Sequence, residues 1–301
     1  IANDGSSIVP LLGLHHGALG LGAKLAAASG GHLAVTTGSN LGDGLSLDTP
    51  PAGFRLANKQ DAATAMAGLL AGGGAAIDFD DHHPIMTDWL APVKRGEDMR
   101  LTITHDHVDP SANQLVFCPQ QFILGIGCAR GCDSDELYDF VTAELRRQNV
   151  NQAAIAAIAS VDLKADEPAI LALAERLDVP FRVFSVTELE RQTGNLANPS
   201  DVVFAEIGTY GVAEAAALEA AMLQAGGAQA SLFTEKRKTK DATLALVKMA
   251  APLLDQRLLR GRKPGKVMLI GIGPGKTDWR TPEAAKWVQS ADELVGYGLY
   301  I

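Results

Sequence analysis

Four cationic side chains fall within five positions of an otherwise acidic chain: Lys236, Arg237, Lys238 and Lys240. They follow an expected strand at Ser231–Phe233, and open α/β sheets bind ligands at the ends of their strands. A cationic loop there would complement a ligand with several carboxylates, and a guanidinium can bind one carboxylate through two hydrogen bonds. A solvated charge run is the plainer alternative. We treat the four residues as candidate substrate-binding residues.

A second charged group comprises Asp162, Lys164, Asp166 and Glu167, which follow an expected strand at Ala153–Ser160. A lysine between carboxylates can orient a substrate, and a carboxylate can position a water. The same acids can also simply stabilise the N-terminus of the next helix. Asp162, Lys164 and Glu167 are therefore candidate catalytic residues, with a helix-capping role as the alternative.

Three more residues are candidates by their placement. Arg130 lies in a glycine-bounded turn after a strand, where backbone amides can bind an anion, although a surface turn is the alternative. Glu214 falls in the first turn of an Ala-rich helix, where it either caps the helix or faces a cleft. His16 lies between a strand and a helix, which suits a general acid as well as a packing role.

No metal site is expected. Cys128 and Cys132 have no further cysteine or histidine near them, and the pairs His82-His83 and His105–His107 lie in loop-like sequence. The three cysteines are also too few for a secreted disulfide framework.

Composition limits the class of protein. Lys and Arg total 26 against 35 Asp and Glu, a formal charge of −9, which argues against general binding to nucleic acid or to an anionic membrane. No apolar run approaches the roughly 20 residues of a membrane span. We expect a cytoplasmic protein, and the sequence leaves open whether it forms a homo-oligomer.

Strands that alternate with Ala-rich helices predict an α/β fold with mostly parallel sheets flanked by helices, in two to three subdomains. The expected strands are Ser7–Leu12, Leu33–Thr37, Ala75–Phe79, Leu101–His105, Leu115–Phe117, Phe122–Ile126, Ala153–Ser160, Phe181–Phe184, Val202–Glu206, Ser231–Phe233 and Ala242–Lys248. The expected helices are Leu19–Ala28, Lys59–Leu70, Asp133–Gln148, Pro168–Leu177 and Ala213–Gln224. Asp133 with Glu136, and Ser185 with Glu188, have the spacing of capping boxes.

Glycines follow a further expected strand at Lys266–Ile270. Gly271, Gly273, Pro274 and Gly275 form a turn in which a backbone can approach a ligand closely, although a plain tight turn is the alternative. The neighbouring pieces Asp278-Trp-Arg-Thr-Pro-Glu-Ala284 and Ala291-Asp-Glu-Leu-Val-Gly-Tyr297 resemble the opening of the tetrapyrrole methylase family, closest to precorrin-3B C(17)-methyltransferase. The resemblance implies an S-adenosylmethionine site at these four residues, in a methylase domain truncated at the C-terminus of this chain.

The body of the chain carries an ordered series of motifs. They are Gly125-Ile-Gly-Cys-Ala-Arg-Gly131, Ser160-Val-Asp-Leu-Lys-Ala-Asp-Glu-Pro168, Tyr210-Gly-Val-Ala-Glu-Ala-Ala-Ala-Leu218 and Glu235-Lys-Arg-Lys-Thr-Lys-Asp-Ala-Thr243. Together they resemble the C-terminal domain of the cobalt-precorrin-5A hydrolase (CbiG) family, shared with CobE proteins. The resemblance implies a role in cobalamin biosynthesis with a corrin or precorrin intermediate as partner.

Two resemblances in one chain favour a fused enzyme whose methyltransferase part transfers a methyl group from S-adenosylmethionine. The alternatives for the CbiG/CobE-like module are a hydrolase that opens a δ-lactone with release of acetaldehyde, and a non-catalytic module that binds and hands over corrin intermediates. The expected organisation is a later part of a CbiG N-terminal-like domain at 1–58, a connector at 59–100, a CbiG C-terminal/CobE-like domain at 101–251, a linker at 252–265 and the methylase start at 266–301.

Overall fold

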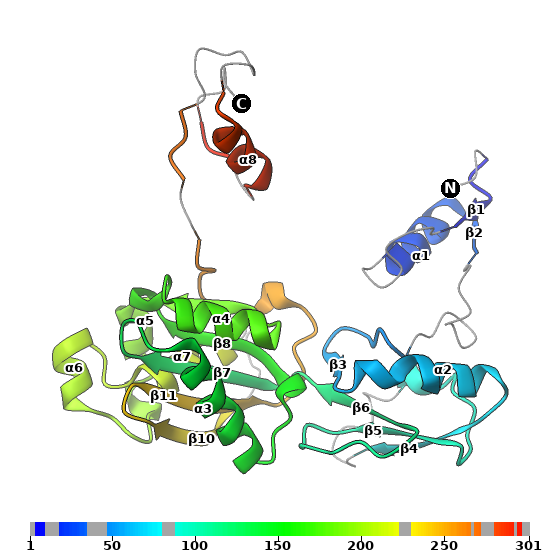
Figure 1. Cartoon of the computed structure of the whole chain (residues 1–301), viewed down its shortest axis with the longest axis horizontal. Coiled ribbons are helices and arrows are strands. Elements are labelled where there is room, and N and C mark those ends of the chain that lie inside the picture. The colour runs from blue at the N-terminus through cyan, green and yellow to red at the C-terminus, as the bar shows by residue number, and fades with distance from the viewer. Residues whose placement is uncertain are drawn as a thin grey trace. The chain divides into compact units, whose positions relative to one another are not determined.

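The computed structural model describes residues 4–9, 18–34, 47–79, 88–222, 230–265, 268–271, 280–291 and 294–296. The chain divides into two compact units, Ile1–Lys263 and Pro264–Ile301 (Figure 1). Among the described residues, no helix has the length and apolar character needed to cross a bilayer.

A five-stranded mixed sheet in the order β10-β11-β7-β8-β9 dominates the first unit. Its parallel strands are β7 (Phe122–Cys128), β8 (Ile155–Val161) and β9 (Phe181–Phe184). Antiparallel to β7 runs β11 (Ala242–Met249), and β10 (Ala230–Lys238) forms the outer edge. The three parallel strands are almost entirely apolar, because helices cover both of their faces.

Helices lie on both faces of this sheet (Figure 1). Apolar side chains of α3 (Ser134–Arg147) and α4 (Pro168–Leu177) share a buried cluster with Leu124. Those of α7 (Val212–Ala221) share a second cluster with Ile123. Successive residues of a strand point to opposite faces, so β7 supplies both layers of the core.

Gly125 explains how closely α7 approaches the sheet. A Cβ at this position would lie 1.9 Å from the carbonyl oxygen of Ala213, well inside contact distance. Glycine removes that obstacle, and the Ala-rich face of α7 packs directly on the backbone of β7.

A smaller four-stranded sheet has the order β3-β6-β5-β4. The strands are β3 (Phe54–Leu56), β6 (Gln114–Pro119), β5 (Met99–Ile103) and β4 (Ala75–Phe79), and α2 (Ala62–Leu70) packs in the same core cluster. β4 lies in the segment predicted as a connector at 59–100, and it pairs in parallel with β5, which crosses residue 100. The sheet therefore takes strands from both sides of that predicted boundary.

The remaining elements lie outside these two sheets. They are β1 (Ser7–Ile8), α1 (Ala18–Ser29), β2 (His32–Leu33), α5 (Val186–Glu190), α6 (Asp201–Ile207), α8 (Pro282–Ser290) and the 3-10 turns Lys59–Asp61, Asp88–Leu90, Gln152–Ala154, Asp162–Lys164, Thr193–Asn195 and Gln256–Leu258.

The predicted α/β class with mostly parallel sheets flanked by helices is confirmed, with β3, β10 and β11 as antiparallel members. The strand predicted at Val202–Glu206 is wrong, since these residues lie in α6. Ser200 caps the N-terminus of this helix and Gly208, with φ of 87°, ends it in the left-handed conformation. These two caps outweigh the β-branched run between them.

Two further predictions differ from the structure. The cationic run was expected in a loop, but Lys236, Arg237 and Lys238 are the last residues of β10, and only Lys240 lies in a turn. Met268–Ile270, expected to be part of a strand, form none in the described part of the second unit.

Residues 252–263, expected within a linker, run along the edge of the five-stranded sheet. Leu253 and Leu259 are buried in the α7-side core. The backbone N–H of Arg262 donates to Val183 O, and Val183 N–H donates to Arg262 O, both at 2.9 Å. The segment thereby covers the open edge of β9, which would otherwise present unpaired backbone groups.

Candidate functional site

β7 and β8 are parallel, so their carboxyl ends lie at the same end of the large sheet. The turn between β10 and β11 lies at this end too, beside the end of β7. Cys128, the last residue of β7, pairs with Ala242 at the start of β11, and the Ala129 N–H donates to Asp241 O at 2.8 Å. The hairpin turn therefore lies beside the loop that follows β7. Strand order thus brings together three charged segments that are far apart in the sequence.

The loop after β7 is fastened to the loop after β8 by an ion-pair network. Arg130 Nη1 lies 2.6 Å from Asp166 Oδ1 and 3.5 Å from Glu167 Oε2. Lys164 Nζ lies 3.5 Å from the same Glu167 oxygen, and the Gly131 N–H donates to Glu167 Oε1 at 3.0 Å. The hydrogen bond with Asp166 raises the pKa of Arg130, and the same bond lowers the pKa of Asp166.

Glu167 is fully buried at the centre of this network. Burial of a carboxylate is costly unless cations and N–H donors compensate its charge, and here Lys164, Arg130 and the Gly131 amide do so. Its contacts are therefore those of a residue that holds the two loops together.

Asp162 lies at the same edge and pairs with a residue that sequence reasoning missed. Arg262 Nη2 lies 3.1 Å from Asp162 Oδ2 and 3.6 Å from Glu188 Oε2. Glu188 also forms the predicted capping box with Ser185, which is confirmed. No local pattern marks Arg262, because its partner Asp162 is 100 residues away in the sequence.

Glu214 is buried and accepts hydrogen bonds on both oxygens. The N–H groups of Ala197 and Asn198 donate to Oε2 at 2.9 and 3.1 Å. Lys236 N–H and Asn198 Nδ2 donate to Oε1 at 2.8 and 3.0 Å. Burial alone would raise the pKa of Glu214, but the bonds from Lys236, Asn198 and Ala197 outweigh it and lower the pKa below its usual value.

The four cations of the run face different surroundings. Lys236 Nζ donates to Asn198 O at 2.7 Å, and Arg237 Nε lies 4.0 Å from Glu144 of α3. Lys238 and Lys240 are exposed and have no hydrogen-bond or ion-pair partner among the described residues. These two lysines are therefore the members of the run that a ligand can pair with directly, although Glu136, Asp139 and Asp241 line the same pocket as Lys240.

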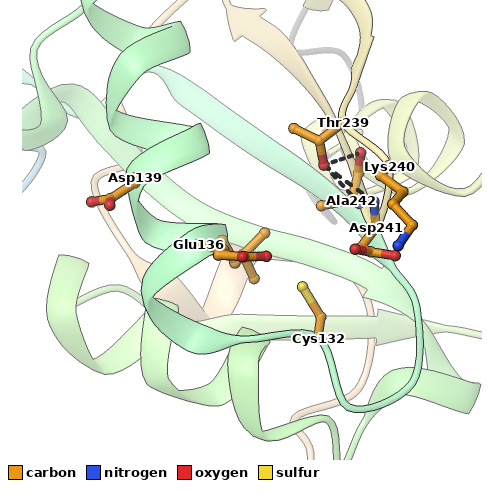
Figure 2. Close-up of a pocket in the computed structure, with 8 residues that line it drawn as sticks. Cys132, Glu136, Asp139, Thr239, Lys240, Asp241 and Ala242 are labelled. Carbon is orange, nitrogen blue, oxygen red and sulfur yellow. Dashed lines mark hydrogen bonds between the residues drawn. The ribbon is translucent and has the colours of Figure 1, made fainter.

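A pocket of about 310 Å³ lies between the first turns of α3 and the hairpin turn that carries Lys240 (Figure 2). Cys132, Glu136 and Asp139 line one side. Thr239 closes the turn opposite by accepting from the Ala242 N–H at 3.0 Å. Asp133 caps α3 by accepting from the N–H groups of Asp135 and Glu136, but Glu136 makes no return bond, so the predicted capping box is only half formed. The Glu136 side chain lines the pocket instead.

The other candidate positions are less informative. His16, Gly273, Pro274 and Gly275 lie outside the described residues, whereas Gly271 is described and exposed. Nothing lies within 4 Å of a Cβ built at Gly271, and the S-adenosylmethionine site at these four residues stays a prediction. A search of the described residues finds no group of three or more metal-ligating side chains.

Known proteins resemble this chain over the part that holds the large sheet. A family model described as cobalamin synthesis G C-terminus matches residues 122–247. Protein CobE from Sinorhizobium sp. is 37% identical over 136 residues, which cover 45% of this chain and 85% of that protein. A cobalt-precorrin-5A hydrolase from Priestia megaterium is 29% identical over 135 residues, 45% of this chain but only 34% of the hydrolase.

One solved structure is also similar to this chain in sequence. A crystal structure of CobE, described as a protein from the cobalamin (vitamin B12) biosynthetic pathway, is 37% identical, with 43% of this chain and 91% of that chain covered and a TM-score of 0.41. Because the match to CobE extends over most of the length of that protein, this chain belongs to the CbiG/CobE family of cobalamin-biosynthesis proteins.

Proposed function

We propose that the domain built on the five-stranded sheet binds a corrin-pathway intermediate through its peripheral carboxylates. The observation that carries this proposal is the pair Lys238 and Lys240, exposed cations at the end of the sheet where β7 ends, which have no partner in the described part of the chain. Corrin precursors carry several acetate and propionate groups, which complement such cations in charge.

Binding without chemistry agrees best with the state of the candidate catalytic carboxylates. Asp162 pairs with Arg262, Glu167 with two cations, and Glu214 accepts four hydrogen bonds. A general base needs a lone pair within reach of a substrate proton. The contacts engage both oxygens of Glu167 and of Glu214, whereas Asp162 is bonded through Oδ2. The domain would hold a labile intermediate and hand it on.

The test is a titration with dicyanocobyrinic acid, a corrin with free carboxylates, at low and high salt. Loss of an exposed charge pair costs about 0.2–1 kcal/mol, so Lys238→Ala with Lys240→Ala should weaken binding about two- to thirtyfold at low salt. High salt should remove most of this difference. The control, Lys24→Ala with Lys59→Ala, removes the same charge away from the large sheet, and equal weakening by both pairs would contradict the proposal.

A δ-lactone hydrolase is the second candidate, since the match to cobalt-precorrin-5A hydrolase spans the same length of this chain as the match to CobE. Under the binding proposal, a cobalt-precorrin-5A substrate releases no acetaldehyde above the rate without protein. Release at turnover, lost in Asp162→Asn, would favour the hydrolase.

The methyltransferase fusion stays a separate proposal that rests on the sequence resemblance at residues 266–301 alone, since the family match ends at residue 247. We expect residues 1–301 to transfer no methyl group from S-adenosylmethionine. Turnover by this chain in a methyl-transfer assay would contradict that expectation.

A further inference from the structure

The helix α6 exposes aromatic surface in a chain where aromatic residues are only 5% of the total. Val203 and Ile207 pack against the α7-side core, but no residue of α6 is fully buried, and Phe204 is 42% exposed. Phe204 stacks on Tyr210, with ring centroids 4.4 Å apart and planes 22° apart. The two rings cover one face of each other, and the Phe204–Tyr210 pair leaves part of its aromatic surface exposed to solvent.

The pair is held in a preformed arrangement. The Gly208 N–H donates to Phe204 O at 2.8 Å, which closes the end of α6 and brings the following residues back toward the ring. The Ser200 N–H donates to Tyr210 O at 2.8 Å, so the two ends of the segment are tied to each other. A preordered surface loses little entropy when a ligand covers it.

The segment that carries the pair begins and ends at the candidate site. At its start, Asn198 accepts a hydrogen bond from Lys236 Nζ and donates to Glu235 at 3.2 Å, both on the cationic strand β10. At its end the chain enters α7, where Val212 lies 3.6 Å from a Cβ built at Gly127, near the carboxyl end of β7. Both ends of the segment that carries the pair thus contact β10 and β7 near the ends of these strands, where Lys238 and Lys240 lie.

We propose that the Phe204–Tyr210 pair is a second subsite, which binds the apolar face of the ring whose carboxylates bind Lys238 and Lys240. This inference rests on the proposed function and specifies its ligand as a flat, apolar ring with anionic groups at its periphery. Stacking on an aromatic ring depends on dispersion and desolvation rather than on net charge. Its contribution should therefore be insensitive to salt, unlike that of the lysines.

The experiment compares dicyanocobyrinic acid with its methyl ester, which keeps the ring and removes the charges. Phe204→Ala should weaken binding of both ligands about three- to tenfold at low and at high salt, the range expected for one lost aromatic contact. Val202→Ala is the control: it removes an apolar side chain that is 69% exposed on the same helix and should change affinity less than about twofold. Phe204→Leu, which keeps apolar bulk, provides the comparison if the alanine variant does not fold.

The outcomes separate this inference from the proposed function. If Phe204 variants bind both ligands normally while the lysine variants lose the acid, the second subsite is wrong and the cationic site stands. If Phe204→Ala weakens both ligands while the lysine variants behave like wild type, the subsite stands and the carboxylate proposal is wrong. If Phe204→Ala changes only the sedimentation behaviour from dimer to monomer, the pair covers a second copy of the chain and the inference is overturned.

Discussion

Replacement of Glu214 by glutamine changes one atom of a buried side chain and should have a large effect. The carboxylate joins three parts of the domain: α7, which carries it, the loop at Ala197 and Asn198, and Lys236 of β10. Each of its oxygens accepts two hydrogen bonds. A glutamine can present only one oxygen, so in either orientation its NH₂ group faces two N–H donors.

The magnitude follows from this count of lost bonds. A hydrogen bond to a charged group contributes about 1.5–3 kcal/mol, and two are lost, so Glu214→Gln should cost about 3–6 kcal/mol. This is a large part of the roughly 5–15 kcal/mol that stabilises a domain. With a urea dependence of about 1–3 kcal/mol per molar, the unfolding midpoint should fall by at least about 1 M.

The assay is urea unfolding of the variant beside Glu175→Gln, an exposed glutamate of α4 that serves as the control. Because the loop could also detach without global unfolding, amide hydrogen exchange of Ala197, Asn198 and Lys236 is measured in parallel. A loss below about 1 kcal/mol together with unchanged exchange would refute the reasoning, since it would mean that the carboxylate holds nothing.

The same residue gives a pH dependence with a definite sign. The pKa of Glu214 is lowered in the folded protein from its ordinary value of 4.5. A lowered folded pKa contributes stability that is present above the unfolded pKa and is lost as the pH falls through the folded value. The stability difference between wild type and Glu214→Gln should therefore be largest above pH 4.5 and shrink below it.

Two other predictions concern packing and thiol chemistry. Gly125→Ala places a methyl group 1.9 Å from Ala213 O and should lower the free energy of unfolding in urea by at least about 1–3 kcal/mol. Gly194→Ala is the control, because nothing lies within 4 Å of a Cβ there, and it should be almost neutral. Equal costs for the two variants would contradict the packing argument. Burial raises the pKa of Cys128 to about 12, so at pH 8 only about one Cys128 thiol in ten thousand is the reactive thiolate. Labelling of Cys128 by iodoacetamide, measured by mass spectrometry, should therefore be far slower in the folded protein than in urea.

The sequence predicted those helices and strands whose bounds are set by residues within the element itself. The helix Pro168–Leu177 and the strand Phe181–Phe184 have the predicted bounds, because proline starts the former and an apolar run defines the latter. Val202–Glu206 failed because its caps at Ser200 and Gly208 decide its structure, while the residues between them favour a strand. Lys236–Lys238 were placed in a loop, although lysines are common on edge strands such as β10.

The candidate site was predictable only in part, for a different reason. Its charged segments follow strands, so their meeting at one sheet edge could be expected from topology. Their pairing could not, because the partners of Arg130 and Arg262 lie 36 and 100 residues away. Which charges are neutralised is decided by these non-local contacts, and residue type gives no information about them.

Whether a cation already has an ion-pair partner determines how readily it can bind a ligand. A carboxylate that approaches Arg130 must compete with Asp166, already 2.6 Å away, and gains only the difference between two similar ion pairs. Lys238 and Lys240 have no ion-pair partner among the described residues, so a carboxylate that approaches them breaks no existing ion pair. Asp166→Asn should therefore strengthen binding of dicyanocobyrinic acid, because it removes the nearer carboxylate partner of Arg130 and leaves only Glu167, whose Oε2 lies 3.5 Å away. If that variant binds as wild type does, Arg130 lies outside the ligand's reach and the lysines alone form the carboxylate site.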